Sequence, residues 1–288
     1  VSQGTFHTTA YMEGVAHKDQ PTNFSITYSF VSHEQHFTRA DIMSSLKPYD
    51  TSSELYKQYT AEEYPHIIKT EKLKKLAHTI VGEEKNPVLQ ASMIYDWIAT
   101  NFPWAGAREY STIPNIPEYV VENRHGDCGQ VALLYITLVR CLGIPARWES
   151  GFMLHPGAEN YHDWAETYFE GTGWVATDPS FGRSTTGESL ADYYKTGIDL
   201  YRFVVNKGVN GSFDPQKNYI RSETVDNQAG EVEWKNGNLE YKDWTSDLHV
   251  DSCIKIDINR PEYSWALTKL SVASMRTSGD HAAEMATQ

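Results

Sequence analysis

A strongly apolar helical segment near the middle of the chain constrains the fold more than any other feature. From Cys128 to Leu142 apolar side chains recur at helical spacing, and Asp127 precedes them as a candidate N-cap. Gly143 and then Pro145 follow the segment. Glycine favours the position just after a helix and proline cannot continue one, so these two residues predict where the helix ends.

Three segments with the pattern of strands follow this helix at short intervals. They are Ala146 to Met153, His162 to Phe169 and Trp174 to Thr177, and turn residues from Glu170 to Gly173 join the last two. A helix that feeds consecutive strands through short links predicts an α+β fold in which an antiparallel sheet packs on the helix.

The remaining pattern predicts three regions. Residues 1–38 form an N-terminal β segment, because Phe6 to Met12 and Asn23 to Val31 resemble strands of a sheet completed elsewhere. Residues 39–205 hold several helices followed by the core described above. Residues 206–288 form a β-rich C-terminal extension.

Local signals add detail to these regions. Asn86 followed by Pro87 predicts a helix start, with an N-cap side chain and a fixed φ in the first turn. Asn236-Gly237 between two strand-like stretches predicts a hairpin. Cys253 to Ile258 alternates like a strand, and Pro261 to Met275 is compatible with a final helix.

Composition argues against several classes of function. Lys and Arg total 25 against 38 Asp and Glu, a formal net charge of −13, and no basic cluster occurs, so nucleic acid is not expected as a partner. No apolar run approaches the roughly 18 residues of a membrane span. Three cysteines are too few for a disulfide framework or a Cys₄ metal site. The stretch from His33 to His36 is one residue short of the H-E-x-x-H zinc motif, so no metal is predicted.

One cysteine stands at a chemically distinctive position. Cys128 follows Gly126 and Asp127 and opens the apolar helix. Unsatisfied backbone N–H groups and the helix dipole favour a thiolate there, which predicts a nucleophile, although a buried core cysteine is the alternative. Cys141 and Cys253 are interpreted as packing residues.

A nucleophilic thiol needs a base and a group that orients the base. His162 lies on the strand expected against the helix of Cys128, and Asp178 ends the next strand. With a two-residue turn between these strands, Asp178 would face Ala165, on the opposite side of the sheet from His162. A bulge, another loop length or a bend is therefore required. His125 is an alternative base because it lies close to Cys128 in sequence.

Four short blocks carry a resemblance to a known family. In chain order they are Asn123–Cys128 (NRHGDC), Gly143–Arg147 (GIPAR), His162–Glu166 (HDWAE) and Gly173–Pro179 (GWVATDP). Over about residues 88–183 they resemble the core of the transglutaminase-like superfamily. The resemblance implies a papain-like α+β fold with a Cys-His-Asp triad at Cys128, His162 and Asp178. Residues 221–234 are more loosely similar to an extension of secreted bacterial members.

The resemblance also implies a function. It favours a cysteine-dependent amide hydrolase that forms a thioacyl-enzyme on a peptide, protein or cell-wall-type polymer. A cross-linking protein-glutamine acyltransferase and a non-catalytic polymer-binding module on the same fold are the alternatives. No cofactor is implied, and a need for calcium stays open. The similarity to secreted members and the start at Val1 rather than Met predict a processed or truncated product that is secreted, periplasmic or at the cell surface.

Further residues receive supporting roles from the same resemblance. Trp104 and Gln130 are candidate oxyanion-hole donors in addition to the backbone N–H of the nucleophile. Trp164 and Glu166 are candidate residues of the substrate cleft. For Glu166, an ion pair with Arg147 is the expectation that we favour.

Overall fold

The computed structural model describes residues 2–3, 8–106, 108–182, 188–225, 227–240, 242–252, 268–273 and 283–287. Its helices are α1 (Arg39–Ser45), α2 (Glu54–Thr60), α3 (Glu71–Val81), α4 (Pro87–Asn101), the 3₁₀ helix η1 (Tyr110–Thr112), α5 (Ile116–Asn123), α6 (Cys128–Cys141) and α7 (Glu188–Lys195). Its strands are β1 (Ser2–Gln3), β2 (Thr8–Glu13), β3 (Ser25–Phe30), β4 (Gln35–His36), β5 (Ala146–Met153), β6 (Asn160–Phe169), β7 (Gly173–Thr177), β8 (Gly197–Ile198), β9 (Arg202–Lys207), β10 (Glu231–Trp234), β11 (Gly237–Leu239), β12 (Leu248–Ser252), β13 (Thr268–Ala273) and β14 (Ala283–Thr287).

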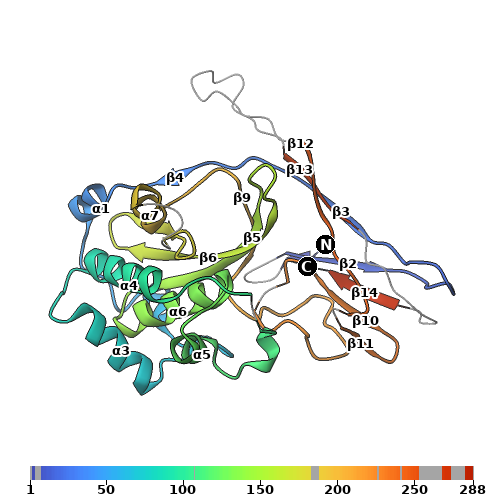
Figure 1. Cartoon of the computed structure of the whole chain (residues 1–288), viewed down its shortest axis with the longest axis horizontal. Coiled ribbons are helices and arrows are strands. Elements are labelled where there is room, and N and C mark those ends of the chain that lie inside the picture. The colour runs from blue at the N-terminus through green and yellow to red at the C-terminus, as the bar shows by residue number, and fades with distance from the viewer. Residues whose placement is uncertain are drawn as a thin grey trace.

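An antiparallel sheet with the order β7-β6-β5-β9 forms the centre of the larger part of the molecule. Helix α6 packs against β5 and β6, and α3, α4 and α5 in turn contact α6 (Figure 1). The α+β class and the antiparallel sheet packed on the central helix are thereby confirmed.

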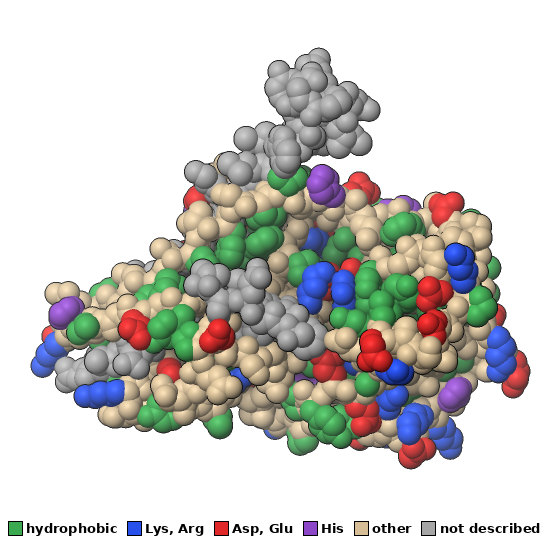
Figure 2. All heavy atoms as spheres, turned by 180° about the vertical axis from the view of Figure 1, so that it is seen from behind, with side chains coloured by type: hydrophobic (Ala, Val, Ile, Leu, Met, Phe, Trp, Pro, Cys, Tyr) green, Lys and Arg blue, Asp and Glu red, His purple; other side chains and the backbone are tan. Residues whose placement is uncertain are grey.

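Seen from behind the view of Figure 1, the surface carries Lys and Arg side chains interspersed with Asp and Glu (Figure 2).

Helix α6 is buried because it is apolar on nearly every side. Asp127 caps its N-terminus as predicted, and every residue from Gly129 to Arg140 is buried. Burial of each Leu, Ile or Val side chain contributes about 1.5–3 kcal/mol, so this one helix supplies a large part of the core energy. Its position brings the first residue, Cys128, against β6.

The charged residue inside this helix is also buried, and it joins four segments. Arg140 donates to the carbonyls of Ala146 and Ala61, at 2.8 Å each, and pairs with the Glu63 carboxylate at 3.0 Å. The other oxygen of Glu63 accepts the backbone N–H of Val209. These bonds compensate for the loss of water around the guanidinium, so the arginine does not interrupt the helix.

The two ends of the chain form a second, β-rich part (Figure 1). Strand β14 lies between β2 and β10, and β13 lies between β3 and β12. The prediction that the N-terminal strands belong to a sheet completed elsewhere is confirmed, as is the β10–β11 hairpin at Asn236-Gly237.

Two predictions for the C-terminal region have other outcomes. A helix over Pro261 to Met275 is wrong for Thr268–Ala273, which forms strand β13 because β3 and β12 supply its backbone partners. The strand predicted from Cys253 lies outside the described residues. The predicted boundary at 205/206 falls within β9, Arg202–Lys207.

A buried histidine links the helical region to the C-terminal extension. His66 is 1% exposed, and its Nε2 lies 3.0 Å from the Thr224 hydroxyl. Burial lowers the pKa of this ring to about 4. Above the ordinary histidine pKa of about 6.5 the ring is neutral in both the folded and the unfolded state. As the pH falls from about 6.5 towards 4, the unfolded state binds a proton that the folded state does not, so the free energy of unfolding falls by roughly 2 kcal/mol.

We expect His66→Gln to remove this pH dependence. The free energy of unfolding in urea, measured at pH 7 and pH 4.5, should fall by about 2 kcal/mol less in the variant than in the wild type. The exposed His78→Gln is the matched control and should not reduce the acid-induced loss. Equal losses in the wild type and in His66→Gln would refute the assignment.

Candidate active site

The N-terminus of α6 is held by a capping box. The Asp127 carboxylate accepts the backbone N–H of Gln130 at 2.9 Å, and the Gln130 side chain accepts the backbone N–H of Asp127 at 3.4 Å. The hydroxyl of Tyr110 donates to the same carboxylate at 2.6 Å. These bonds fix the first turn of the helix, and with it the direction in which the Cys128 thiol points.

The residue after the nucleophile candidate has no room for a side chain. A Cβ at Gly129 would collide with the Tyr110 hydroxyl and would lie 2.6 Å from the Asp163 carboxylate and 3.1 Å from the Trp148 ring. Glycine is therefore required here for close approach of η1, α6 and β6, and the helix start lies directly against β6.

The register between β6 and β7 resolves the geometric conflict in the sequence. Phe169 pairs with Gly173 and Ala165 with Thr177, so the connection is a three-residue loop and not a two-residue turn. The shift by one position brings Asp178, just after β7, to the face of the sheet that carries His162. Another loop length was thus the correct alternative.

The structure brings His162 and Asp178 into contact. Nε2 of the imidazole lies 2.7 Å from Oδ2 of Asp178, and both residues are buried. The Phe181 ring meets the imidazole edge-on at 5.6 Å between centroids, and Trp164 stacks at 6.1 Å. The imidazole is therefore held in one orientation, with Nδ1 as the nitrogen that Asp178 does not engage.

Opposing effects set the proton affinities of this pair. Burial alone would raise the pKa of Asp178, but the charges of His162 and Arg202 and a hydrogen bond from the Ser180 N–H hold it below its usual value. Burial lowers the pKa of His162, Asp178 acts in the opposite direction, and Arg202 adds to the lowering. Burial and Arg202 thus oppose a proton on the imidazole, whereas Asp178 favours one.

The thiol of Cys128 lies against Asp163, the residue that follows His162 on β6. Its Sγ is 3.5 Å from Oδ2 of Asp163, and the cysteine retains some exposed surface. Burial raises the pKa of the Cys128 thiol well above its usual value, and the carboxylates of Asp163 and Asp127 raise it further. Burial and these two carboxylates therefore oppose the thiolate that the N-terminus of the helix favours.

Arg202 is a neighbour of the site that the sequence did not single out. It lies on β9, with Nη1 3.2 Å from Oδ2 of Asp178 and Nε 3.1 Å from Asp199. An isolated Arg on a strand gives no local signal, and only the pairing of β9 with β5 brings it here.

The C-terminal extension also reaches the site, through Gln228. Its Nε2 donates to the backbone carbonyl of His162 at 2.9 Å and to Oδ1 of Asp163 at 2.6 Å. This segment precedes β10 by only a few residues, so the extension holds the stretch of β6 that lies beside the thiol.

The other predicted residues around the nucleophile lie as follows. Trp104 is 65% exposed, and its backbone forms a parallel bridge with Gly126. Gln130 is buried, and its Nε2 has no hydrogen-bond partner among the described residues. The role of either side chain as an oxyanion donor stays a prediction. His125 is half-buried, and its Nδ1 lies 2.9 Å from the Asn123 carbonyl.

The two residues predicted for the substrate cleft are buried. Trp164 has no exposed surface, and its Nε1 donates to Glu149 at 2.8 Å. Glu166 pairs with Arg147, as the sequence analysis favoured, and Arg147 lies 4.1 Å above the Trp174 ring. Since both side chains are covered by other parts of the protein, the structure does not place them on an open cleft wall.

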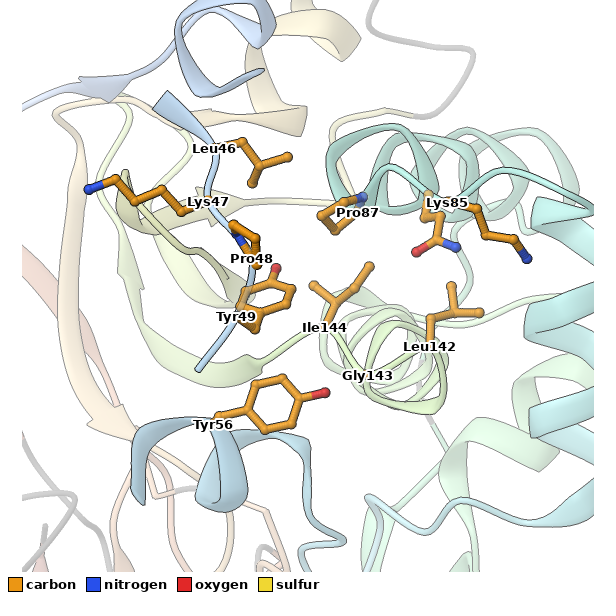
Figure 3. A pocket seen from close by; sticks show the side chains of 11 residues that line it. Leu46, Lys47, Pro48, Tyr49, Tyr56, Lys85, Pro87, Leu142, Gly143 and Ile144 are labelled. Carbon is orange, nitrogen blue, oxygen red and sulfur yellow. The ribbon is translucent and has the colours of Figure 1, made fainter. Parts of the chain in front are cut away.

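The described residues also form a cavity of about 430 Å³ at the other end of α6 (Figure 3). Tyr49, Tyr56 and Ile144 point into it, and Lys47 and Lys85 extend from either side of it. None of the candidate catalytic, oxyanion-hole or substrate-cleft residues lines it. In the described part of the chain no group of His, Cys, Asp and Glu is arranged to hold a metal ion, and none of the helices there is long and apolar enough to cross a membrane.

The fold and these positions define an α+β protein with a cysteine at the start of a helix that packs on an antiparallel sheet. Residues 74–179 match the model of the Transglutaminase-like superfamily, and that segment contains Cys128, His162 and Asp178. This segment is therefore similar to the core of the transglutaminase-like superfamily.

Individual proteins are more distant. The Bacillus subtilis protein YebA is 25% identical over 149 residues, which are 45% of this chain but only 20% of YebA. A crystal structure described as "a Putative Cysteine Protease from Cytophaga hutchinsonii" aligns at a TM-score of 0.44 with 17% identity, over 68% of this chain and 73% of that one. The periplasmic domain of TgpA from Pseudomonas aeruginosa aligns at 0.38 with 18% identity, over 46% and 49%.

Proposed function

We propose that the protein is a cysteine-dependent amide hydrolase that acts on peptide or protein substrates through a thioacyl-enzyme. The observation that carries the proposal is the 2.7 Å hydrogen bond between His162 and Asp178. His162 lies on β6, the strand that contacts the thiol of Cys128 through Asp163. Nucleophilic catalysis needs an oriented base beside a thiol. The superfamily match over the segment that contains all three residues supports the same conclusion.

In the proposed first step, Sγ of Cys128 attacks the carbonyl carbon of the substrate, and the thiol proton passes to Nδ1 of His162. The carbonyl electrons move onto oxygen, and the backbone N–H of Cys128 donates to the resulting oxyanion, an interaction worth about 3 kcal/mol. Asp178 accepts from Nε2–H throughout, which stabilises the imidazolium formed.

The second half of the cycle returns the enzyme to its starting state. The imidazolium of His162 gives its proton to the leaving amine as the C–N bond breaks, and a thioester on Cys128 remains. A water molecule then loses a proton to His162 and attacks the thioester. As the C–S bond breaks, His162 returns this proton to the sulfur, so one water is consumed, a carboxylic acid is released and the free thiol is restored.

The proposal predicts peptide cleavage that depends on one of the two cysteines of α6. Incubation with a peptide library, read by mass spectrometry, should give cleavage products whose rate of formation falls at least about 1,000-fold in Cys128→Ala. Cys141→Ala is the matched control, since it makes the same substitution at the other end of the same helix, and it should retain cleavage.

A parallel incubation separates hydrolysis from transfer. A fluorescent primary amine is supplied together with a glutamine-containing protein. If label incorporation exceeds cleavage and disappears in Cys128→Ala, the protein is an acyltransferase, and the proposed hydrolase activity is refuted. Polymer binding without cleavage or label incorporation, unchanged in Cys128→Ala, would instead support a non-catalytic module.

A further inference from the structure

A buried guanidinium lies behind the candidate triad. The side chain of Arg202 is 3% exposed and lies among the rings of Trp164, Phe181 and Tyr194. A buried cation is costly unless carboxylates and hydrogen bonds compensate for the lost water. Here the compensation comes from two aspartates, one of which belongs to the triad.

Asp199 anchors Arg202 from the side away from the triad. Its carboxylate lies 3.1 Å from Nε of Arg202, accepts the Tyr194 hydroxyl at 2.8 Å and lies 3.1 Å from Nε2 of His155. It also accepts the backbone N–H of Tyr201 at 2.8 Å. Four partners on one carboxylate fix its position, and they thereby fix the guanidinium that it holds.

The other contact of Arg202 falls on the atom that the imidazole uses. Oδ2 of Asp178 lies 3.2 Å from Nη1 of Arg202 and 2.7 Å from Nε2 of His162. The negative charge of Asp178 is therefore shared between two cations when the imidazole is protonated. Nη1 and Nη2 have no hydrogen-bond partner among the described residues, so Arg202 acts on this oxygen by charge: it attracts the carboxylate and repels a proton on the ring.

From this arrangement we propose that Arg202 is a positioning residue of the triad, whose charge holds Asp178 beside His162 and opposes a proton on the imidazole. The inference rests on the proposed function for its catalytic meaning.

The charged groups that face the imidazole and the thiol come from several elements of the fold. Those that face His162 are Asp178 at the end of β7, Arg202 on β9 and, further away, Asp199 before β9. Those that face Cys128 are Asp163 on β6, Asp127 at the helix cap and Asp178, with Tyr110 hydrogen-bonded to Asp127. The charged groups facing the thiol are thus acidic, and they oppose a thiolate just as Arg202 opposes an imidazolium.

The test is a titration of His162 followed by NMR in the full chain with labelled histidine, the resonance being assigned through His162→Gln. Arg202→Gln removes a positive charge and should raise the pKa of His162 by about one pH unit or more. Asp199→Asn removes a negative charge and should lower it. Opposite shifts distinguish an electrostatic role from general damage to the structure. Arg147→Gln, an Arg→Gln change on the neighbouring strand, is the control and should leave the resonance unshifted.

Shifts of the same sign, or no shift in either variant, would overturn the proposal. If Arg202→Gln does not fold, Asp199→Asn decides alone: an unchanged or raised pKa of His162 refutes the inference. The titration needs no substrate. Opposite shifts in a protein that cleaves no peptide would therefore leave the role of Arg202 standing while refuting the hydrolase function.

Discussion

Asp178→Asn is expected to slow acylation of Cys128 by about 10³–10⁴-fold, the largest catalytic effect of any conservative substitution in this chain. In the native protein the carboxylate accepts from Nε2 of His162, which leaves Nδ1 unprotonated and able to take the thiol proton. An asparagine amide donates to Nε2 instead. The ring proton then moves to Nδ1, and the base is lost although the geometry is kept.

The measurement is the rate at which an activated ester acylates Cys128 in a single turnover. Asp192→Asn serves as the control, because this exposed carboxylate pairs with Lys195 away from the site, and it should retain the wild-type rate. Thermal unfolding should show that Asp178→Asn is folded at the assay temperature. A loss smaller than 10-fold in a folded protein would mean that Asp178 does not orient the base.

Gly151→Ala is expected to cause the largest loss of stability, about 4 kcal/mol. A Cβ at this position would collide with the backbone carbonyl of Phe203 and lie 3.0 Å from the backbone nitrogen of Val205. Backbone atoms cannot rotate away as side chains do. The register between β5 and β9 already shifts between Ser150 and Gly151, so the added methyl group must separate the two strands.

Urea unfolding of Gly151→Ala and the wild type measures this loss. Gly106→Ala is the matched control, since a Cβ there meets nothing within 4 Å, and it should change the free energy of unfolding by less than about 0.5 kcal/mol. Because β9 carries Arg202, folded Gly151→Ala should also show an altered titration of His162. A stability within 1 kcal/mol of the wild type would show that β9 moves aside more easily than its pairing indicates.

Local chemistry made much of the core predictable. The predicted strand Ala146–Met153 matches β5, and Asn86 and Asp127 cap the helices that they were expected to cap. Each of these features depends on residues a few positions apart, because a cap or an alternating pattern acts within a single element. The order of the four motif blocks pointed to the core in another way, through its resemblance to a known family.

Features set by strand pairing were harder to predict from the sequence. The extra loop residue between β6 and β7 decides whether Asp178 faces His162, and neither loop length was distinguished by the turn residues Glu170 to Gly173. Strand β13 was interpreted as part of a helix because its pairing with β3 joins residues more than 200 positions apart. Such contacts leave no local periodic signal.

The sequence by itself determined the nucleophile helix, the strands that follow it and the three residues proposed to act together, Cys128, His162 and Asp178. The tertiary structure decided which charges surround them. Asp163 lies against the thiol and opposes the thiolate that the helix N-terminus favours, and Arg202 lies beside Asp178 and opposes a proton on His162. The physical reason is that proton affinity depends on burial and on charges within a few ångströms, which are set only when distant segments pack together.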